Sequence, residues 1–435
     1  MNREEQSRSL RERAHAVIPG GTHTYAKGDD QYPDEAPAVL MRGEGCRVWD
    51  AAGNEFIEYG MGLRAVSLGH AHPRVTEAAV RQMRVGVNYT RPAPIEIECA
   101  ELLAELVGAD MVKFCKDGST ATTAAVKLAR AHTGRDYVAL CEDHPFFSYD
   151  DWFIGTTPMN AGIPRAISEL SLTFRYNDLA SLEALFDSHP GSVACVILEP
   201  ERTDPPQDGF LTGVQALCAE HGAVFILDEM ITGFRWHLGG AQAYYGLSPD
   251  LSIFGKAMAN GFSLSALVGR REIMERGGIR HDGERVFLLS TTHGAETHAL
   301  AAAVETMTIY RDENIVDKLW AAGTRLSDGI NRVASELGVS EHFLAVGKPP
   351  SLVYATRDRS GRPSQAYRTL FLQEMIDRGF IVPSFVVSAA HEDQDIDRTI
   401  EAVRSALVVY AAALEQGSER FLRGPSVKPV FRRFN

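Results

Sequence analysis

The feature that most constrains the fold is a repeated alternation of short apolar runs and longer helical patterns between about residues 60 and 310. Helical patterns such as residues 121–133 and 213–221 separate the apolar runs. Buried apolar strands that alternate with helices are typical of βαβ units in a largely parallel sheet, so we predict an α/β fold. The expected strands are residues 112–115, 137–140, 193–198, 224–227 and 251–254.

The two ends of the chain have a different character. The first part contains an amphipathic helical stretch and then two short strands, residues 47–50 and 55–58, around an Ala-Gly-Asn turn. The last part predicts helices with a few strands and is too short for another large sheet. We therefore expect a large domain over residues 60–312 and a small α+β domain formed by residues 1–59 and 313–435.

Charge and cysteine spacing exclude several classes of function. The net charge of −13 argues against a nucleic acid or an anionic membrane as partner. The six cysteines form no close pairs, which predicts neither a metal site nor a disulfide framework. The N-terminal stretch lacks the apolar core of a secretory signal, and no apolar run approaches the ~18 residues that span a bilayer. We expect a cytoplasmic protein that acts on small molecules.

An amine and a carboxylate follow two of the expected strands. Asp228 comes directly after one apolar run, and Lys256 follows another. In open parallel sheets, ligands collect outside the carboxyl ends of the strands. The chemistry of pyridoxal 5′-phosphate (PLP) uses this pair, because the lysine forms an imine with the cofactor and shuttles a proton, while the aspartate keeps the pyridine nitrogen protonated. A lysine at a strand end is more often solvated or ion-paired, so the pair alone leaves both interpretations open.

A third element lies where an expected strand meets the helix at residues 121–133. Gly118 and Ser119 precede this helix, and the backbone N–H groups at a helix N-terminus form a site for anions such as phosphate. Ser119 and Thr120 could equally be helix N-caps. A cofactor with a phosphate group would favour the first interpretation.

Four motifs occur here in the order and spacing of the class III aminotransferases, and the likeness extends from Pro19 to about His391. The chain resembles the branch that contains glutamate-1-semialdehyde 2,1-aminomutase and its sugar-modifying relatives. This resemblance implies a fold-type I PLP-dependent transferase, with a large αβα domain around a mainly parallel sheet and a small α+β domain. The motifs are residues 117–121, 228–235, 255–256 and 292–295.

The resemblance also assigns roles around the cofactor. Lys256 matches the Schiff-base lysine, and Asp228 matches the partner of the pyridine nitrogen. Met230 would pack against one face of the ring. Gly118 and Ser119 match the residues that cradle the phosphate.

Two further cofactor contacts follow from the resemblance. Thr292 matches the threonine that reaches the phosphate from the neighbouring subunit, which implies a homodimer with shared active sites. Residues 290–292 could instead form a polar turn that caps the following helix. The aromatic residue that stacks on the ring in the family has no direct match, and His144 and Phe146 are the candidates because each offers a flat π face.

The departures from the family pattern lie on the substrate side. Lys27 lies in the segment where the mutase carries an arginine; its ammonium attracts an anion but lacks the guanidinium fork that grips a carboxylate. Arg202 is a candidate substrate anchor, with a solvent-facing side chain as the alternative. Residues 383–391 match a mutase segment but are shorter and lack its glutamate. A changed substrate is the simplest explanation, because the cofactor residues are intact.

The implied function is PLP-dependent transfer of an amino group. The donor would be an amine such as glutamate, and the acceptor a carbonyl-bearing small molecule such as a keto-sugar or another biosynthetic intermediate. An aminomutase of the glutamate-1-semialdehyde type is the first alternative, since it shares every cofactor residue and needs no external donor. A non-catalytic binding protein with the same fold is the second, and the retention of Lys256 with Asp228 argues against it.

Overall fold

The computed structural model describes residues 3–142, 144, 146–201 and 203–434. The chain divides into two compact units: a large unit, Pro73–Val316, and a small unit that combines Met1–His72 with Asp317–Asn435. The divisions therefore fall after His72 and Val316, where the sequence suggested positions 59 and 312. Residues 60–72 belong with the small unit because of backbone hydrogen bonds, in which Gly45 and His70 each donate to the other and the Ala389 N–H donates to the Ser67 carbonyl.

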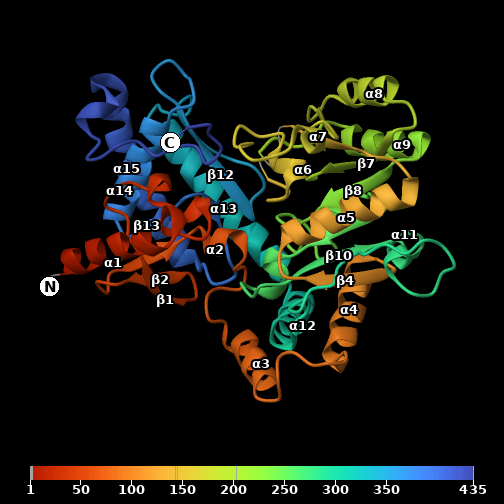
Figure 1. Cartoon of the computed structure of the whole chain (residues 1–435). Helices are drawn as coiled ribbons and strands as arrows, with labels where there is room; N and C mark the ends of the chain where they lie inside the picture. The colour runs from red at the N-terminus through yellow and green to blue at the C-terminus, as the bar shows by residue number, and fades with distance from the viewer. Residues whose placement is uncertain (1–2, 143, 145, 202, 435) are drawn as a thin grey trace. The chain divides into compact units, whose positions relative to one another are not determined.

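A seven-stranded sheet forms the centre of the large unit in the described part of the chain (Figure 1). Six of its strands are parallel and β10 runs antiparallel to both of its neighbours, which agrees with the expected mainly parallel sheet. In spatial order the strands are β4 (Met111–Cys115), β10 (Ser265–Gly269), β9 (Leu251–Phe254), β8 (Val224–Asp228), β7 (Val193–Leu198), β5 (Tyr137–Cys141) and β6 (Ser171–Phe174).

Helices cover both faces of this sheet. α8 (Leu179–Ser188) and α9 (Phe210–His221) pack on one face, where Phe225 and Leu227 of β8 join their apolar cluster. Successive side chains of a strand point to opposite faces, so Asp228 belongs to the other face. The long helix α5 (Gly118–Thr133) crosses the strands (Figure 1) and buries its alanine-rich side against them. The layers confirm the expected αβα architecture.

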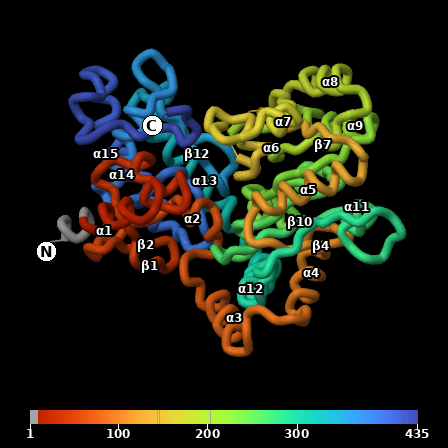
Figure 2. The backbone as a smooth tube through the Cα atoms, in the orientation of Figure 1, coloured from red at the N-terminus to blue at the C-terminus, as the bar shows by residue number. Residues whose placement is uncertain are grey.

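The remaining helices of the large unit are shorter or lie away from the sheet centre. α12 packs against α3 and α4 (Figure 2). These remaining helices are α3 (Pro73–Met83), α4 (Pro94–Val107), α6 (Asp151–Ile154), α7 (Arg165–Ser168), α10 (Gly240–Tyr245), α11 (Arg271–Met274) and α12 (Thr297–Asp312), with short 3-10 turns at Lys256–Ala259 and Glu275–Gly277.

The small unit is assembled from both ends of the chain. One sheet has the order β1-β2-β3-β13, in which β13 from the C-terminal part pairs with β3 through Phe380 and Ile57. The hairpin expected from the Ala-Gly-Asn turn is present as β2 and β3. A second sheet has the order β11-β12-β14. The strands are β1 (Leu40–Glu44), β2 (Arg47–Asp50), β3 (Glu55–Glu58), β11 (Phe343–Val346), β12 (Ser351–Thr356), β13 (Phe380–Ile381) and β14 (Phe385–Val386).

Helices surround these small sheets, which gives the small unit its α+β character. Among the described residues, no helix combines the length and apolar character that crossing a membrane requires. The helices are α1 (Arg3–Val17), α2 (Met61–Arg64), α13 (Ile315–Glu336), α14 (Gln365–Asp377) and α15 (Asp393–Gln416), with short 3-10 turns at Pro19–Gly21, Tyr25–Lys27, Asp29–Gln31 and Ser418–Arg420.

Candidate active site

Asp228 and Lys256 lie at the same edge of the large sheet. Asp228 is the last residue of β8, and its backbone pairs in parallel with Ile253 of β9. Lys256 comes two residues after the end of β9. Burial raises the pKa of Asp228, and the positive charge of Lys256 opposes that rise, so the two charges act on each other. The structure thus brings together the amine and the carboxylate that the sequence suggested.

The backbone turn at Lys256 is tightly constrained. Lys256 has a φ of 45°, in the left-handed region that residues with a side chain rarely occupy. Such strained positions cluster at functional sites. Gly255 next to it has no room for a side chain, because a Cβ there would lie 2.6 Å from Met230 Cε and 2.6 Å from Ser265 Oγ. A side chain at this position would therefore force Met230 and Ser265 to move.

Asp228 is a buried carboxylate in an unfavourable electrostatic position. Its residue is only 3% exposed, and burial together with the charge of Glu199 raises its pKa to about 7. Its Oδ1 accepts a hydrogen bond from the Met230 N–H at 2.9 Å. A positive charge beside this carboxylate, such as a protonated ring nitrogen, would stabilise its ionised form. Asp228 therefore fits the pyridine end of PLP.

The neighbouring carboxylate, Glu229, is engaged elsewhere. Its oxygens accept hydrogen bonds from the Ala241 N–H at 2.9 Å and the Gln242 N–H at 2.6 Å, at the start of α10. The Thr232 hydroxyl also donates to it. Glu229 holds a helix N-terminus, which leaves Asp228 as the carboxylate of this pair that can meet a ligand.

Glu199 is a member of the site that the sequence interpretation did not assign to the cofactor. It follows β7 directly, as Asp228 ends β8, and is 4% exposed. Its N–H donates to His144 Nδ1 at 3.0 Å. The signal that could have found it is the same apolar run before a carboxylate that singled out Asp228.

The two candidate stacking residues lie in different environments. His144 is 5% exposed, its ring lies 5.5 Å from that of Tyr176, and it is joined to Glu199 as described. Phe146 is 48% exposed, and its ring packs edge-on against Phe153 at 5.8 Å. Through Glu199, His144 is linked to the surroundings of Asp228.

The N-terminus of α5 offers donors for a phosphate. The Asp117 carboxylate caps the helix by accepting from the Thr120 N–H at 2.9 Å. The N–H groups of Gly118 and Ser119 come before the first backbone bond of the helix, in which the Ala121 N–H donates to the Asp117 carbonyl. A helix N-terminus of this kind favours an anion. Ser119 is buried, and its Oγ accepts from the Tyr149 N–H at 3.1 Å.

Met230 joins the phosphate end of the site to the lysine end. A Cβ on Gly118 would lie 3.0 Å from Met230 Cε, and one on Gly255 would lie 2.6 Å from the same atom. The Ser265 hydroxyl lies 3.9 Å from Met230 Sδ. The helix N-terminus, Asp228 and Lys256 therefore converge around one methionine, and this set of groups fits the phosphate, ring nitrogen and aldehyde of PLP.

Thr292 lies on an exposed segment before α12. Its carbonyl accepts a hydrogen bond from Asn88 Nδ2 at 2.9 Å, and the residue is exposed in the single chain. A role toward the phosphate of a second subunit stays a prediction.

The two predicted substrate residues are Lys27 and Arg202. Lys27 is exposed, belongs to the small unit and lines a cavity of about 660 Å³ there. Val48, Ile376 and Ile381 form part of the apolar wall of that cavity. Arg202 lies outside the described residues. The role of Lys27 toward a substrate therefore stays a prediction.

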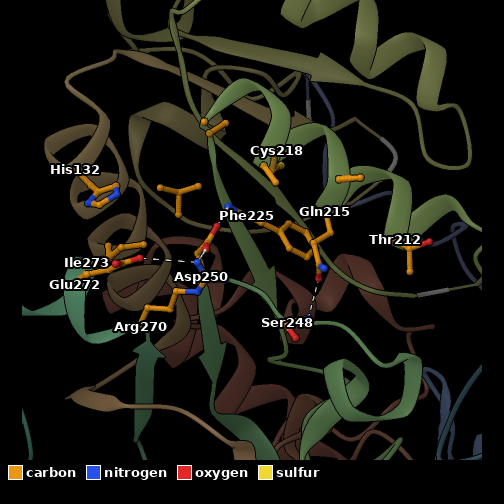
Figure 3. Close-up of a pocket in the computed structure, with 15 residues that line it drawn as sticks. His132, Thr212, Gln215, Cys218, Phe225, Ser248, Asp250, Arg270, Glu272 and Ile273 are labelled. Carbon is orange, nitrogen blue, oxygen red and sulfur yellow. Dashed lines mark hydrogen bonds and ion pairs between the residues drawn. The ribbon is translucent and has the colours of Figure 1, made fainter.

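A second cavity, of about 470 Å³, lies at the amino ends of β8 and β9 (Figure 3). Asp250 lines it, accepts from the Phe225 N–H at 2.8 Å and forms an ion pair with Arg270 at 3.0 Å. These charges hold the start of β8 against the turn before β9. The cavity lies at the amino ends of these strands, whereas Asp228 and Lys256 lie at their carboxyl ends. It is therefore separate from the candidate active site.

Comparisons with known proteins agree with this arrangement. Residues 29–343 match the family model described as Aminotransferase class-III. The glutamate-1-semialdehyde 2,1-aminomutase of Desulfitobacterium hafniense (strain Y51) is 32% identical over 427 residues, which cover 93% of this chain and 98% of that protein. The enzyme of the same name from Aquifex aeolicus is 31% identical and covers 90% and 96% of the two chains.

Solved structures are similar over almost the whole length. The PLP internal aldimine form of the Sphingopyxis sp. MTA144 FumI protein has a TM-score of 0.87 and 29% identity, covering 94% of this chain and 98% of that chain. An omega-transaminase from Sphaerobacter thermophilus has a TM-score of 0.84 and 26% identity, covering 92% and 97%.

Proposed function

Because the chain belongs to the class-III aminotransferase family, we propose that it transfers an amino group from a donor such as glutamate to a carbonyl-bearing small molecule. Its fold is that of the fold-type I PLP-dependent transferases, and its cofactor is pyridoxal 5′-phosphate. PLP supplies an electron sink for the bonds around the amino-bearing carbon. The observation that carries the proposal is the pair of Asp228 and Lys256 at the ends of two neighbouring parallel strands.

Lys256 is the proposed catalytic residue. Its amine would hold the cofactor covalently and, once displaced by the amino substrate, would move the proton that leaves the substrate carbon. The strained turn and the close packing at Gly255 support this role, since they fix the direction from which the side chain leaves the backbone. A lysine whose backbone is held in one conformation can bring its amine back to the same substrate carbon in each half-reaction.

Asp228 is proposed to hold the ring nitrogen protonated. Its burial and the nearby Glu199 make an uncompensated charge unfavourable, and a protonated ring nitrogen relieves this. Gly118 and Ser119 would bind the phosphate at the N-terminus of α5, and Met230 would contact the ring. His144 is the proposed stacking residue, because it is the buried candidate and is linked to Glu199.

The active site is proposed to be shared between two copies of the chain. The phosphate of PLP is close to a dianion at neutral pH, and a buried dianion needs several donors. Thr292 would supply a further donor from the second copy, which agrees with its exposure in the single chain. The homodimer is therefore part of the proposal.

Lys27 is proposed to attract an anionic group of the substrate. Asp29 and Glu58 line the same small-unit cavity as Lys27, so the proposal rests on the place of Lys27 in the segment where the mutase carries an arginine. The keto-sugar acceptor considered from the family resemblance remains one candidate of the wider carbonyl class.

An aminomutase is the alternative function, because the relatives that are 32% identical over 93% of the chain carry that name. The aminotransferase needs an external amino donor and the aminomutase does not, so an assay with and without a donor distinguishes them. We expect the PLP form mixed with glutamate to change to the amine form of the cofactor in a single turnover, with keto acid released, while Lys256→Ala does not turn over. If candidate amines leave the cofactor unchanged but glutamate-1-semialdehyde is isomerised without a donor, the protein is the mutase.

A further inference from the structure

An ion pair outside the proposed catalytic set connects two of its segments. Lys116 immediately precedes the capping residue of α5, and its Nζ donates to Glu296 Oε2. Glu296 is the N-cap residue of α12, four positions after Thr292. The lysine holds the pKa of Glu296 below its usual range. The side chains of Lys116 and Glu296 are 31% and 18% exposed, so the pair is shielded more than a typical surface pair.

The Glu296 carboxylate also orders the segment that carries Thr292. Its second oxygen, Oε1, lies 3.2 Å from His293 Nδ1. His293 follows Thr292 directly, so one carboxylate binds a residue beside Thr292 and a residue beside the phosphate-binding helix N-terminus. The Glu296 carboxylate therefore links the Thr292 segment to the start of α5.

The rest of the segment is held by another stretch of the chain. Asn88 Nδ2 donates to the Thr292 carbonyl at 2.9 Å, and the Thr297 hydroxyl donates to the Gly86 carbonyl at 2.8 Å. Lys116 is itself held from the lysine side of the site. Its carbonyl accepts a hydrogen bond at 2.8 Å from the hydroxyl of Ser263, which follows Lys256 by a few residues. The Thr292 segment is thus fixed at its ends by residues 86–88, and the Lys116–Glu296 pair ties it to the cofactor-binding edge of the sheet.

We propose that Glu296 is a positioning residue that, through its ion pair with Lys116, holds Thr292 in the place from which it binds the cofactor phosphate of a second copy of the chain. This inference rests on the proposed function, in which PLP binds at Gly118 and Ser119 and Thr292 completes the site of the partner. Without the pair, the Thr292 segment loses its connection to the helix N-terminus. Glu296 also engages the Lys116 ammonium, which would otherwise be available to the phosphate itself.

The test measures the affinity for PLP, by following the absorbance of the imine during titration of the apoprotein. We expect Glu296→Gln to weaken PLP binding by roughly 3- to 10-fold, the effect of one lost contact. The matched control is Glu169→Gln, which breaks an exposed i,i+4 pair with Arg165 and should leave the affinity unchanged.

A double-mutant comparison identifies the path of the effect. If Glu296 acts through Thr292, the double variant Thr292→Val/Glu296→Gln should bind PLP no more weakly than Thr292→Val alone. Independent effects would add, and additive losses overturn the proposal. Tighter PLP binding in Glu296→Gln would overturn it too, because Lys116 would then be a phosphate ligand restrained by Glu296. Should Glu296→Gln fold poorly, Glu296→Asp keeps the charge at a shorter reach and should show a smaller loss of affinity; an unchanged affinity in both variants refutes the role.

The same measurements separate this inference from the proposed function. If Thr292→Val weakens PLP binding and Glu296→Gln does not, the shared site stands and the positioning role alone fails. If Thr292→Val has no effect, the shared site fails and the positioning role fails with it. If the wild-type protein forms no imine at Lys256, the proposed function itself is wrong.

Discussion

The adjacent carboxylates of Asp228 and Glu229 serve different parts of the large unit. Glu229 accepts hydrogen bonds from the first N–H groups of α10, whereas Asp228 stays at the end of β8 and is held by the Met230 N–H. Burial raises the pKa of both groups to about 7. The two residues therefore have similar electrostatics and separate tasks, which makes them a matched pair for mutation.

Asp228→Asn should leave PLP bound and slow the half-reaction by orders of magnitude, because a neutral ring nitrogen is a poor electron sink. Glu229→Gln should instead weaken the start of α10 and lower the free energy of unfolding by about 0.5–2 kcal/mol, the usual effect of losing a helix cap. Single-turnover absorbance and urea denaturation of both variants check these outcomes. A near-normal half-reaction in Asp228→Asn would contradict the assigned role.

The stability of the apoprotein should depend on pH through Asp228. The carboxyl has an ordinary pKa of 3.8 in the unfolded chain and about 7 in the folded protein. Between these values the folded state keeps a proton that the unfolded state has released, so this contribution to stability falls as the pH rises and is lost above the folded pKa. Urea midpoints measured at about pH 5 and about pH 7.5 should drop less in Asp228→Asn than in the wild type. Equal drops would show that Asp228 ionises normally.

Gly255→Ala should be far more damaging than Gly118→Ala. An added Cβ at Gly255 would lie 2.6 Å from both Met230 Cε and Ser265 Oγ, whereas at Gly118 the nearest atom, the same Met230 Cε, lies 3.0 Å away. We expect a loss of about 1–3 kcal/mol in unfolding free energy for Gly255→Ala, typical of overpacking. Thermal and urea unfolding measure the difference. Equal stability of the two variants would mean that Met230 and Ser265 move aside readily.

Thr292→Val should weaken PLP affinity by roughly 1–3 kcal/mol, the usual cost of leaving a buried partner unsatisfied. Mixing Lys256→Ala dimers with Thr292→Val dimers, with subunit exchange shown independently, should create one wild-type site in each mixed dimer. Tight PLP binding and turnover should then reappear. If exchange occurs and neither returns, the phosphate site lies within one chain.

The sequence by itself determined the local elements and pointed to Asp228 and Lys256, which the structure brings to the same edge of the sheet. Strands β7 and β9 have the bounds of their apolar runs, because a buried strand must be apolar along its whole length. Asp228 and Lys256 could be identified because each interrupts this pattern at a strand end. The family motifs pointed to the start of α5 as the candidate phosphate site, since the turn there depends on neighbouring residues only.

The tertiary structure alone decided the features that depend on distant contacts. β10 lies antiparallel between β4 and β9. Its short apolar sequence does not indicate that position or direction. The first division of the chain falls after His72 because Gly45 bonds to His70. The different partners of Asp228 and Glu229, and the contact of Met230 with both Gly118 and Gly255, likewise arise from packing between separate segments. A local pattern fixes the conformation of its own residues, whereas which residues meet across segments is set by the packing of the whole unit.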